Sequence, residues 1–175
     1  LLPFSILLGV KYLFFSGGFD QFLYYVTSDL SQFFIIARLF NVILGVLSIV
    51  LLYKTVKNIF RNNHMALLAA FLLSTSLFHI LISATGRHWL PISFLFMLGL
   101  FFLSDGNFSF RRKFLYSMLV AGIGMGISVI MVILPILIFY WTLFYEKKSI
   151  TVLLKEKIFY LASGIFIFLA VLPAV

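Results

Sequence analysis

The residues best suited to chemistry lie in the stretch SATGRHWLP, residues 83–91, between two long apolar runs. The planar guanidinium of Arg87 can bind two phosphate oxygens at once. His88 can add a hydrogen-bond donor or titrate near neutral pH, and Trp89 is a residue type that anchors helices at a membrane interface. The stretch therefore predicts either a phosphate-binding site or a plain connecting loop with a Trp anchor. These residues alone favour the two interpretations equally.

Other polar residues stand inside or beside the apolar runs. Arg38, near the start of one run, either extends its side chain to lipid headgroups or faces a cavity and pairs with an acid or a phosphate. For His79, on an apolar helix, an interhelical hydrogen bond is favoured over a ligand role. Asp20 and Asp29 precede the Arg38 run, where capping of the next helix is favoured over a catalytic carboxylate.

The absences narrow the range of functions. The sequence has no Cys, which excludes a disulfide framework and a thiol nucleophile within this chain. It has no HExxH, GxxxxGK[ST] or GxSxG motif, so it predicts no metal site and leaves a requirement for a divalent cation open. No Asp or Glu lies within the well-defined apolar runs, which argues against an ion-coupled transporter.

The chain that carries these residues is very apolar. Of its 175 residues, 63% are hydrophobic and 10% are charged, and its mean hydropathy is +1.18. Soluble domains carry about 25% charged residues, so the composition predicts an all-α, polytopic transmembrane helix bundle with membrane lipids as partners. The net charge of +8 would suggest nucleic acid in a soluble protein. Here it marks cytoplasmic loops, and no nucleic-acid partner is predicted.

Spanning a hydrocarbon core of about 30 Å takes about 20 apolar residues in a helix. We therefore predict a single transmembrane domain over 1–175. It comprises an outer juxtamembrane segment and loop at 1–31 and transmembrane segments at 32–53, 65–83, 89–104, 115–145 and 158–175. The chain opens on Leu1 without the features of a signal peptide, so we expect it to be part of a longer chain.

Segment 115–145 needs a special interpretation. About 30 residues are more than one untilted span needs and fewer than two full crossings need. We predict a pair of short helices, bent around Gly122, Gly124 and Gly126 or near Pro135. One long tilted helix is the alternative.

The orientation follows from the basic loops. Ten of the 13 Lys and Arg residues lie in three loops, 54–64, 105–113 and 146–157. The positive-inside rule places these loops in the cytoplasm. Residues 83–88 then lie on the outer side.

The sequence from Arg38 to about Leu103 resembles the GT-C superfamily of integral-membrane glycosyltransferases, in particular the protein-mannosyltransferase, dolichyl-phosphate-mannose-dependent type. The residues that carry the resemblance read ARLFNVILGVLSIVLLYKTVKNIFRNNHMALLAAFLLSTSLFHILISATGRHWLPISFLFMLGLFFL. It is similar to the family's Arg-led helix, short basic loop, Ala/Leu-rich helix and outer loop with an Arg. The text LVAGIGMGISVIMVILPILIFYW looks like the helices that follow, and 1–15 looks like an outer juxtamembrane segment.

The resemblance implies an inverting hexosyltransferase of a prokaryotic plasma membrane. Such an enzyme moves a sugar from a polyprenyl-phosphate donor to an acceptor on the extracytoplasmic side. It implies a catalytic carboxylate in the first outer loop, expected upstream of Leu1. Arg87 and His88 become candidates for the donor phosphate, and Arg38 holds a family-typical position. Where the family often has a second acid, this chain has His88 and Trp89. A non-catalytic transporter, flippase or assembly subunit that binds lipid-linked sugar is therefore the alternative.

Overall fold

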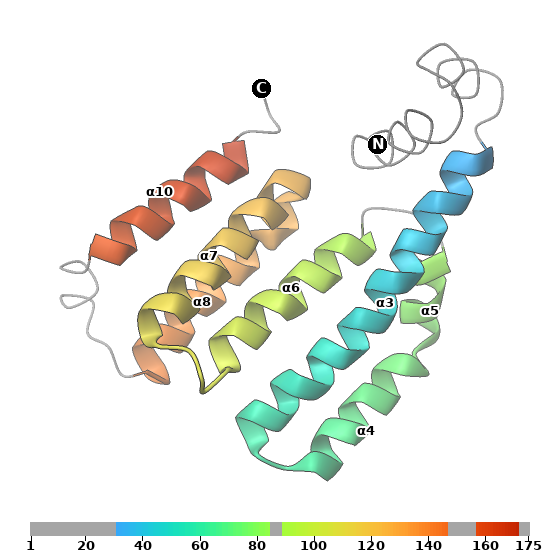
Figure 1. Ribbon diagram of the computed structural model, residues 1–175, viewed down its shortest axis with the longest axis horizontal. Coiled ribbons are helices and arrows are strands. Elements are labelled where there is room, and N and C mark those ends of the chain that lie inside the picture. Colours follow the sequence, from blue (N-terminus) through green and yellow to red (C-terminus); the bar gives the residue numbers. More distant parts are fainter. Residues whose placement is uncertain (1–30, 85–88, 147–156, 172–175) are drawn as a thin grey trace.

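The computed structural model describes residues 31–84, 89–146 and 157–171. These residues form helices and the turns between them, with no β-strand in the described ranges, which confirms the predicted all-α helix bundle (Figure 1). In chain order the helices are α3 (Ser31–Phe60), α4 (Asn63–Ser74), α5 (Leu77–Ala84), α6 (Trp89–Ser104), α7 (Phe110–Ile127), the 3-10 helix η1 (Val129–Val132), α8 (Ile133–Phe144) and α10 (Lys157–Val171).

The apolar helices differ in length. One stretch of α3, Ala37–Phe60, is long and apolar enough to cross a membrane by itself. Helices α4 and α5 meet the same test only as a pair, with a bend of 56° between them. Helix α6 and the η1–α8 and α10 segments are apolar but shorter. The predicted segment 89–104 has the same bounds as α6.

Helix α6 lies between two groups of helices (Figure 1). On one side it packs on α3, which in turn packs on α4 and α5. On the other side it packs on α7, which carries α8 and α10. The main apolar core fills this second group, and Phe114 of α7 is its largest fully buried side chain. Its ring lies 5.9 Å from Phe159 of α10 and 6.1 Å from Phe139 of α8, measured between centroids.

Close packing of α7 on α10 depends on Gly122. A Cβ atom added to this residue would lie 3.1 Å from the backbone Cα and O atoms of Phe166. Backbone yields less readily than a flexible side chain, so a larger residue here would meet the neighbouring helix unless the two helices moved slightly apart. Small residues play this part widely in membrane helix packing.

The predicted pair of short helices in 115–145 is confirmed. The chain breaks at Ser128, whose backbone is extended, between α7 and η1. Lys113 Nζ near the start of α7 lies 2.8 Å from Glu146 Oε1 just after α8, so the two helices run antiparallel. The turn lies at neither predicted place. Gly122 is used in packing, and Pro135 falls in the first turn of α8, where its missing N–H removes no helical hydrogen bond.

Other boundaries also differ from the predicted ones. Helix α7 begins at Phe110, so Arg111, Arg112 and Lys113 lie on its first turn rather than in a loop at 105–113. Helix α3 continues to Phe60, so Lys54 and Lys57 lie on its last turns rather than in a loop at 54–64. Their long side chains allow this, because the Lys54 Nζ lies 6.0 Å from the centroid of the Phe101 ring and the charge stays exposed. The predicted segment 65–83 is interrupted between α4 and α5.

Candidate functional site

The predicted site residues divide between described and undescribed parts of the chain. Arg87 and His88 lie outside the described residues. Arg38 lies on the first turns of α3 with an exposed side chain. Trp89 is the first residue of α6, and its side chain is 41% exposed. Its predicted role as an interface anchor stays a prediction.

The helices on either side of residues 85–88 meet α3 at Gly45. A Cβ atom on Gly45 would lie 2.7 Å from Ser83 Oγ of α5 and 3.5 Å from Leu90 Cδ2 of α6. The His79 Nε2 atom lies 3.3 Å from the Gly45 carbonyl oxygen, which confirms the predicted interhelical hydrogen bond. Ser83 Oγ donates to the His79 carbonyl oxygen at 2.7 Å. The end of α5 and the start of α6 are therefore both fixed against one point of α3.

Arg38 lies on the same face of α3 as this junction. It precedes Gly45 by seven residues, which in an α-helix is about two turns and about 10 Å along the axis. The structure thus brings Arg38 to the end of the bundle where α5 ends and α6 begins. We call this the Arg38 end. The connection that holds Arg87 and His88 joins Ala84 to Trp89 at this end.

Buried polar side chains on α3 were missed by the sequence reasoning. Asn41, Ser48 and Thr55 are all less than 5% exposed and are spaced seven residues apart, so they follow one face of the helix. Ser48 Oγ donates to the Leu44 carbonyl oxygen at 2.8 Å, and Thr55 Oγ1 has no hydrogen-bond partner among the described residues. The signal that could have found them is this spacing within an apolar run.

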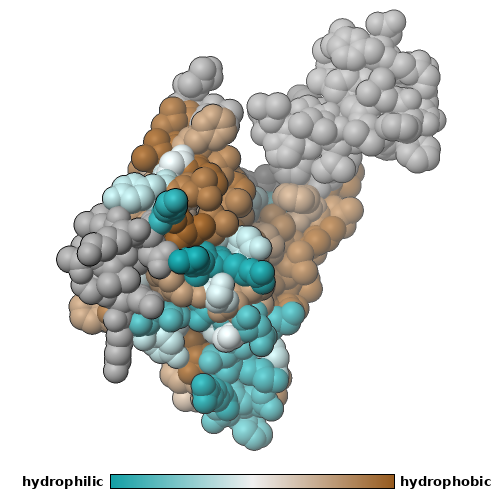
Figure 2. Space-filling model, turned by 60° about the vertical axis from the view of Figure 1, so that its left-hand side comes forward, coloured by the Kyte–Doolittle hydropathy of each residue, from teal (hydrophilic) through white to brown (hydrophobic). Residues whose placement is uncertain are grey.

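The opposite end of the bundle is strongly basic. Seven Lys and Arg residues lie where α3 ends and where α7 and α10 begin, namely Lys54, Lys57, Arg61, Arg111, Arg112, Lys113 and Lys157. We call this the basic end. Figure 2 shows hydrophilic side chains gathered toward one end of the visible face, with apolar surface above them. Most of the described Lys and Arg residues therefore lie at one end of the helices, which is the bias that the positive-inside rule describes for membrane proteins.

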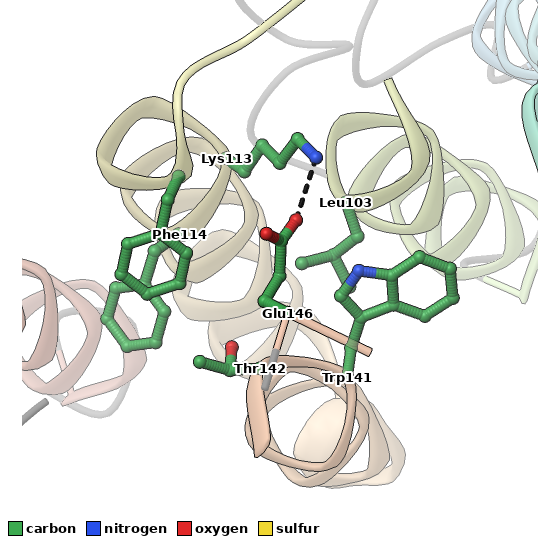
Figure 3. Close-up of a pocket in the computed structure, with 7 residues that line it drawn as sticks. Leu103, Lys113, Phe114, Trp141, Thr142 and Glu146 are labelled. Carbon is green, nitrogen blue, oxygen red and sulfur yellow. Dashed lines mark hydrogen bonds and ion pairs between the residues drawn. The ribbon is translucent and has the colours of Figure 1, made fainter. Parts of the chain in front are cut away.

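The ion pair of Lys113 and Glu146 lies at the basic end, between α7 and α8 (Figure 3). Leu103, Phe114 and Thr142 line the same place, and Trp141 lies beside them. The space that they enclose is too small for a water molecule. This arrangement is a packed joint between helices and not a ligand site.

Carboxylates are scarce in the described part of the chain. Asp105 and Glu146 are its acids, and both lie toward the basic end. Within the described ranges no group of three or more His, Asp or Glu side chains could hold a metal ion. Among the described residues the cation at the Arg38 end is Arg38, whose exposed guanidinium is of a type that can bind an anion.

The fold and the gathering of basic residues at one end are those of a helical membrane protein, with Arg38 at the end opposite its basic end. The family model for dolichyl-phosphate-mannose-protein mannosyltransferase matches residues 21–175, and the chain belongs to this family, which is of the GT-C glycosyltransferase type. The match supports mannosyltransferase-type glycosyltransferase activity in general. The searches of curated proteins and of solved structures found no match.

Proposed function

We propose that this chain forms part of a membrane-embedded mannosyltransferase that takes its sugar from a polyprenyl-phosphate donor. The acceptor receives the sugar on the extracytoplasmic side. The observation that carries the proposal is the family match over most of the chain. Lipid-linked mannose is the donor that the family's name implies. The placement of Arg38 at the end opposite the basic end supports it, because a basic end that faces the cytoplasm directs the Arg38 end outward.

In the proposed mechanism Arg87 and His88 bind the donor phosphate. The acceptor hydroxyl attacks the anomeric carbon, the bond from that carbon to the phosphate oxygen breaks, and the lipid phosphate leaves with an added negative charge. A guanidinium that holds two phosphate oxygens stabilises this charge more in the transition state than in the bound donor. Arg38, on the α3 face that leads to Gly45, is the second cation for the same phosphate.

We propose donor binding, and not proton removal, for the residues that the structure describes. Its described acids lie toward the basic end, far from the Arg38 end. A base for the acceptor hydroxyl is therefore not assigned to any described residue.

The test is sugar transfer by the full-length protein in sealed membrane vesicles, with radiolabelled mannose on a polyprenyl phosphate as donor. Arg87→Ala should lower kcat as well as raise the KM for the donor, and so lower kcat/KM by about 10- to 100-fold, since it removes charge-assisted hydrogen bonds to the phosphate. Arg87→Lys should recover only part of this loss, because an ammonium group cannot bind two oxygens in the same fork. Arg38→Ala should give a smaller decrease.

The matched control is Arg112→Ala, which removes an exposed Arg at the basic end and should leave kcat/KM unchanged. Equal activity of the wild-type protein and Arg87→Ala would overturn the phosphate assignment. Transfer from a nucleotide sugar, with none from the polyprenyl donor, would overturn the donor class. Transfer that needs donor on the basic side of the vesicle would overturn the orientation.

A further inference from the structure

Helix α5 is attached to the bundle mainly through α3. None of its side chains is buried, and it packs on α3 far more than on α4 or α6. At its start the chain bends by 56°, so α5 does not continue the axis of α4. Leu77, Phe78 and Leu81 of α5 are each more than half exposed, so α5 has less apolar packing than the buried helices have. The contacts at Gly45 lie close to Ala84, the last residue of α5, and so are placed to set where it is held.

The polar contact at this point has a defined direction. A carbonyl oxygen only accepts hydrogen bonds, so the His79 Nε2 atom carries the hydrogen and donates to the Gly45 oxygen at 3.3 Å. This oxygen has a second lone pair beyond the one that an α-helical hydrogen bond uses. Gly45 has no side chain to block the approach, and Ser83, one turn after His79, fills the space beside it.

We propose that His79 is a positioning residue that holds α5 against α3 at Gly45 and thereby places the chain that leaves Ala84. The hydrogen bond is partly buried, which limits competition from water for it. An apolar ring at this position would fill the space but would not fix the rotation of α5. The consequence for catalysis rests on the proposed function, because the chain leads from Ala84 to the proposed phosphate-binding residues.

The geometry permits a direct measurement of this contact. A Cβ atom on Gly45 would lie 3.4 Å from the Ser83 Cβ, close to the separation of about 3.5 to 4.5 Å in disulfides. Because this chain contains no Cys, the pair Gly45→Cys and Ser83→Cys adds the only thiols to its sequence. Its rate of oxidative cross-linking in membranes reports how α5 lies on α3, whether or not the protein transfers sugar.

The experiment combines this pair, in the full-length protein, with His79→Gln, His79→Asn and His79→Phe. The Gln amide nitrogen reaches the place of Nε2, whereas the Asn amide is one methylene too short. His79→Gln should cross-link at the wild-type rate, and His79→Asn and His79→Phe about 2- to 10-fold more slowly, the range for loss of one neutral hydrogen bond. The control is His64→Phe, at an exposed histidine of α4 near the basic end. It should cross-link at the wild-type rate.

Sugar transfer separates positioning from simple packing. Without the Cys pair, kcat/KM for the polyprenyl donor should follow the same order among the His79 variants. With the pair, oxidation should raise transfer by His79→Phe to the level of the oxidised pair that retains His79, and reduction should lower it again. Equal cross-linking in all variants would overturn the proposal, as would reduced cross-linking with unchanged transfer. If cross-linking follows the expected order but the wild-type protein transfers no mannose, the proposed function fails while the contact of α5 with α3 stands.

Discussion

Two apolar segments of this protein are interrupted, with different results. Residues 63–84 break between α4 and α5, bend by 56° and continue toward the Arg38 end. In residues 110–144 the helix breaks at Ser128 and the chain turns back. As a result, α7 begins at the basic end and α8 ends there. The first segment joins the two ends of the bundle, and the second leaves and returns to the same end (Figure 1).

Hydroxyl groups at the two breaks explain the difference locally. Before the first break Ser74 Oγ and Thr75 Oγ1 each donate to the Phe71 carbonyl oxygen at 2.9 Å. A Ser or Thr hydroxyl that bonds a carbonyl oxygen of the preceding turn bends a helix but does not reverse the chain. At the second break Ser128 is extended and its Oγ accepts from the Ile130 N–H at 3.4 Å, which starts a new helical turn. Hydroxyl residues can therefore bend or reverse a membrane segment without Gly or Pro at the break.

The sharpest prediction is an all-or-none difference in labelling by a membrane-impermeant thiol reagent. Single Cys substitutions at Asn107 and Tyr145 flank the reversed segment, and those at Asn63 and Ala84 flank the bent one. All four side chains are exposed. Asn107→Cys and Tyr145→Cys should label from the same side, because Lys113 and Glu146 bring the ends of the hairpin together. Asn63→Cys and Ala84→Cys should label from opposite sides.

The measurement uses intact cells and inverted vesicles, and the wild-type chain, which has no Cys, gives the background. We expect only Ala84→Cys to react in intact cells. Reaction of Asn107→Cys and Tyr145→Cys from opposite sides would show that α7 and α8 do not form a hairpin. Reaction of Ala84→Cys and Asn107→Cys from the same side would contradict the proposed topology, in which the Arg38 end faces outward and the basic end faces the cytoplasm. The proposed function depends on this topology.

A second prediction concerns the ion pair that closes the hairpin. Lys113 and Glu146 are 13% and 23% exposed, and their charged atoms lie 2.8 Å apart. Lys113→Glu or Glu146→Lys alone places like charges together, and each should lower the free energy of unfolding by about 1–3 kcal/mol. The double swap should recover most of this loss. Thermal unfolding in detergent measures all three variants.

The control for the swap is Lys157→Glu, at an exposed Lys of the basic end, which should change stability little. The bent segment has no such pair among its described residues, so the comparison predicts that only the hairpin responds to charge reversal. A double swap no more stable than the single variants would show that the two charges are not coupled.

The sequence predicts much of this fold because membrane helices leave strong signals. Apolar length alone locates α6, and the basic residues on both sides of 115–145 predict the reversal that the structure confirms. The break between α4 and α5 was not predicted, because Ser74 and Thr75 are common inside membrane helices and only their hydrogen bonds show the bend. Lys54 shows a second limit, since a charged residue need not end a helix when its stem can reach water.

The candidate site is predictable to a smaller extent. Arg38 and Trp89 are visible because charged and indole side chains are rare in an apolar sequence. The meeting of His79 and Gly45 is not visible, because it joins residues 34 positions apart through a crossing of two helices. A glycine in an apolar run indicates only that helices can approach closely there. Which helix approaches is a property of the packed bundle.

The smallest predicted effect distinguishes the starts of α4 and α7. Asn62 Oδ1 accepts from the His64 N–H at 2.9 Å and from the Met65 N–H at 3.3 Å. Ser109 stands at the same position before α7, but its side chain makes no capping hydrogen bond. Asn62→Ala should therefore lower the free energy of unfolding by about 1 kcal/mol, whereas Ser109→Ala should change it little.

Thermal unfolding of the purified variants measures this difference, and Asn62→Asp is the rescue control. Asp accepts the same hydrogen bonds and adds a negative charge at the helix N-terminus, where it is favourable. It should therefore be at least as stable as the wild-type protein. If Asn62→Ala and Ser109→Ala lose equal stability, capping does not fix where the bent segment starts. The turn at Arg61, whose φ of 52° is left-handed, would then have to set that start alone.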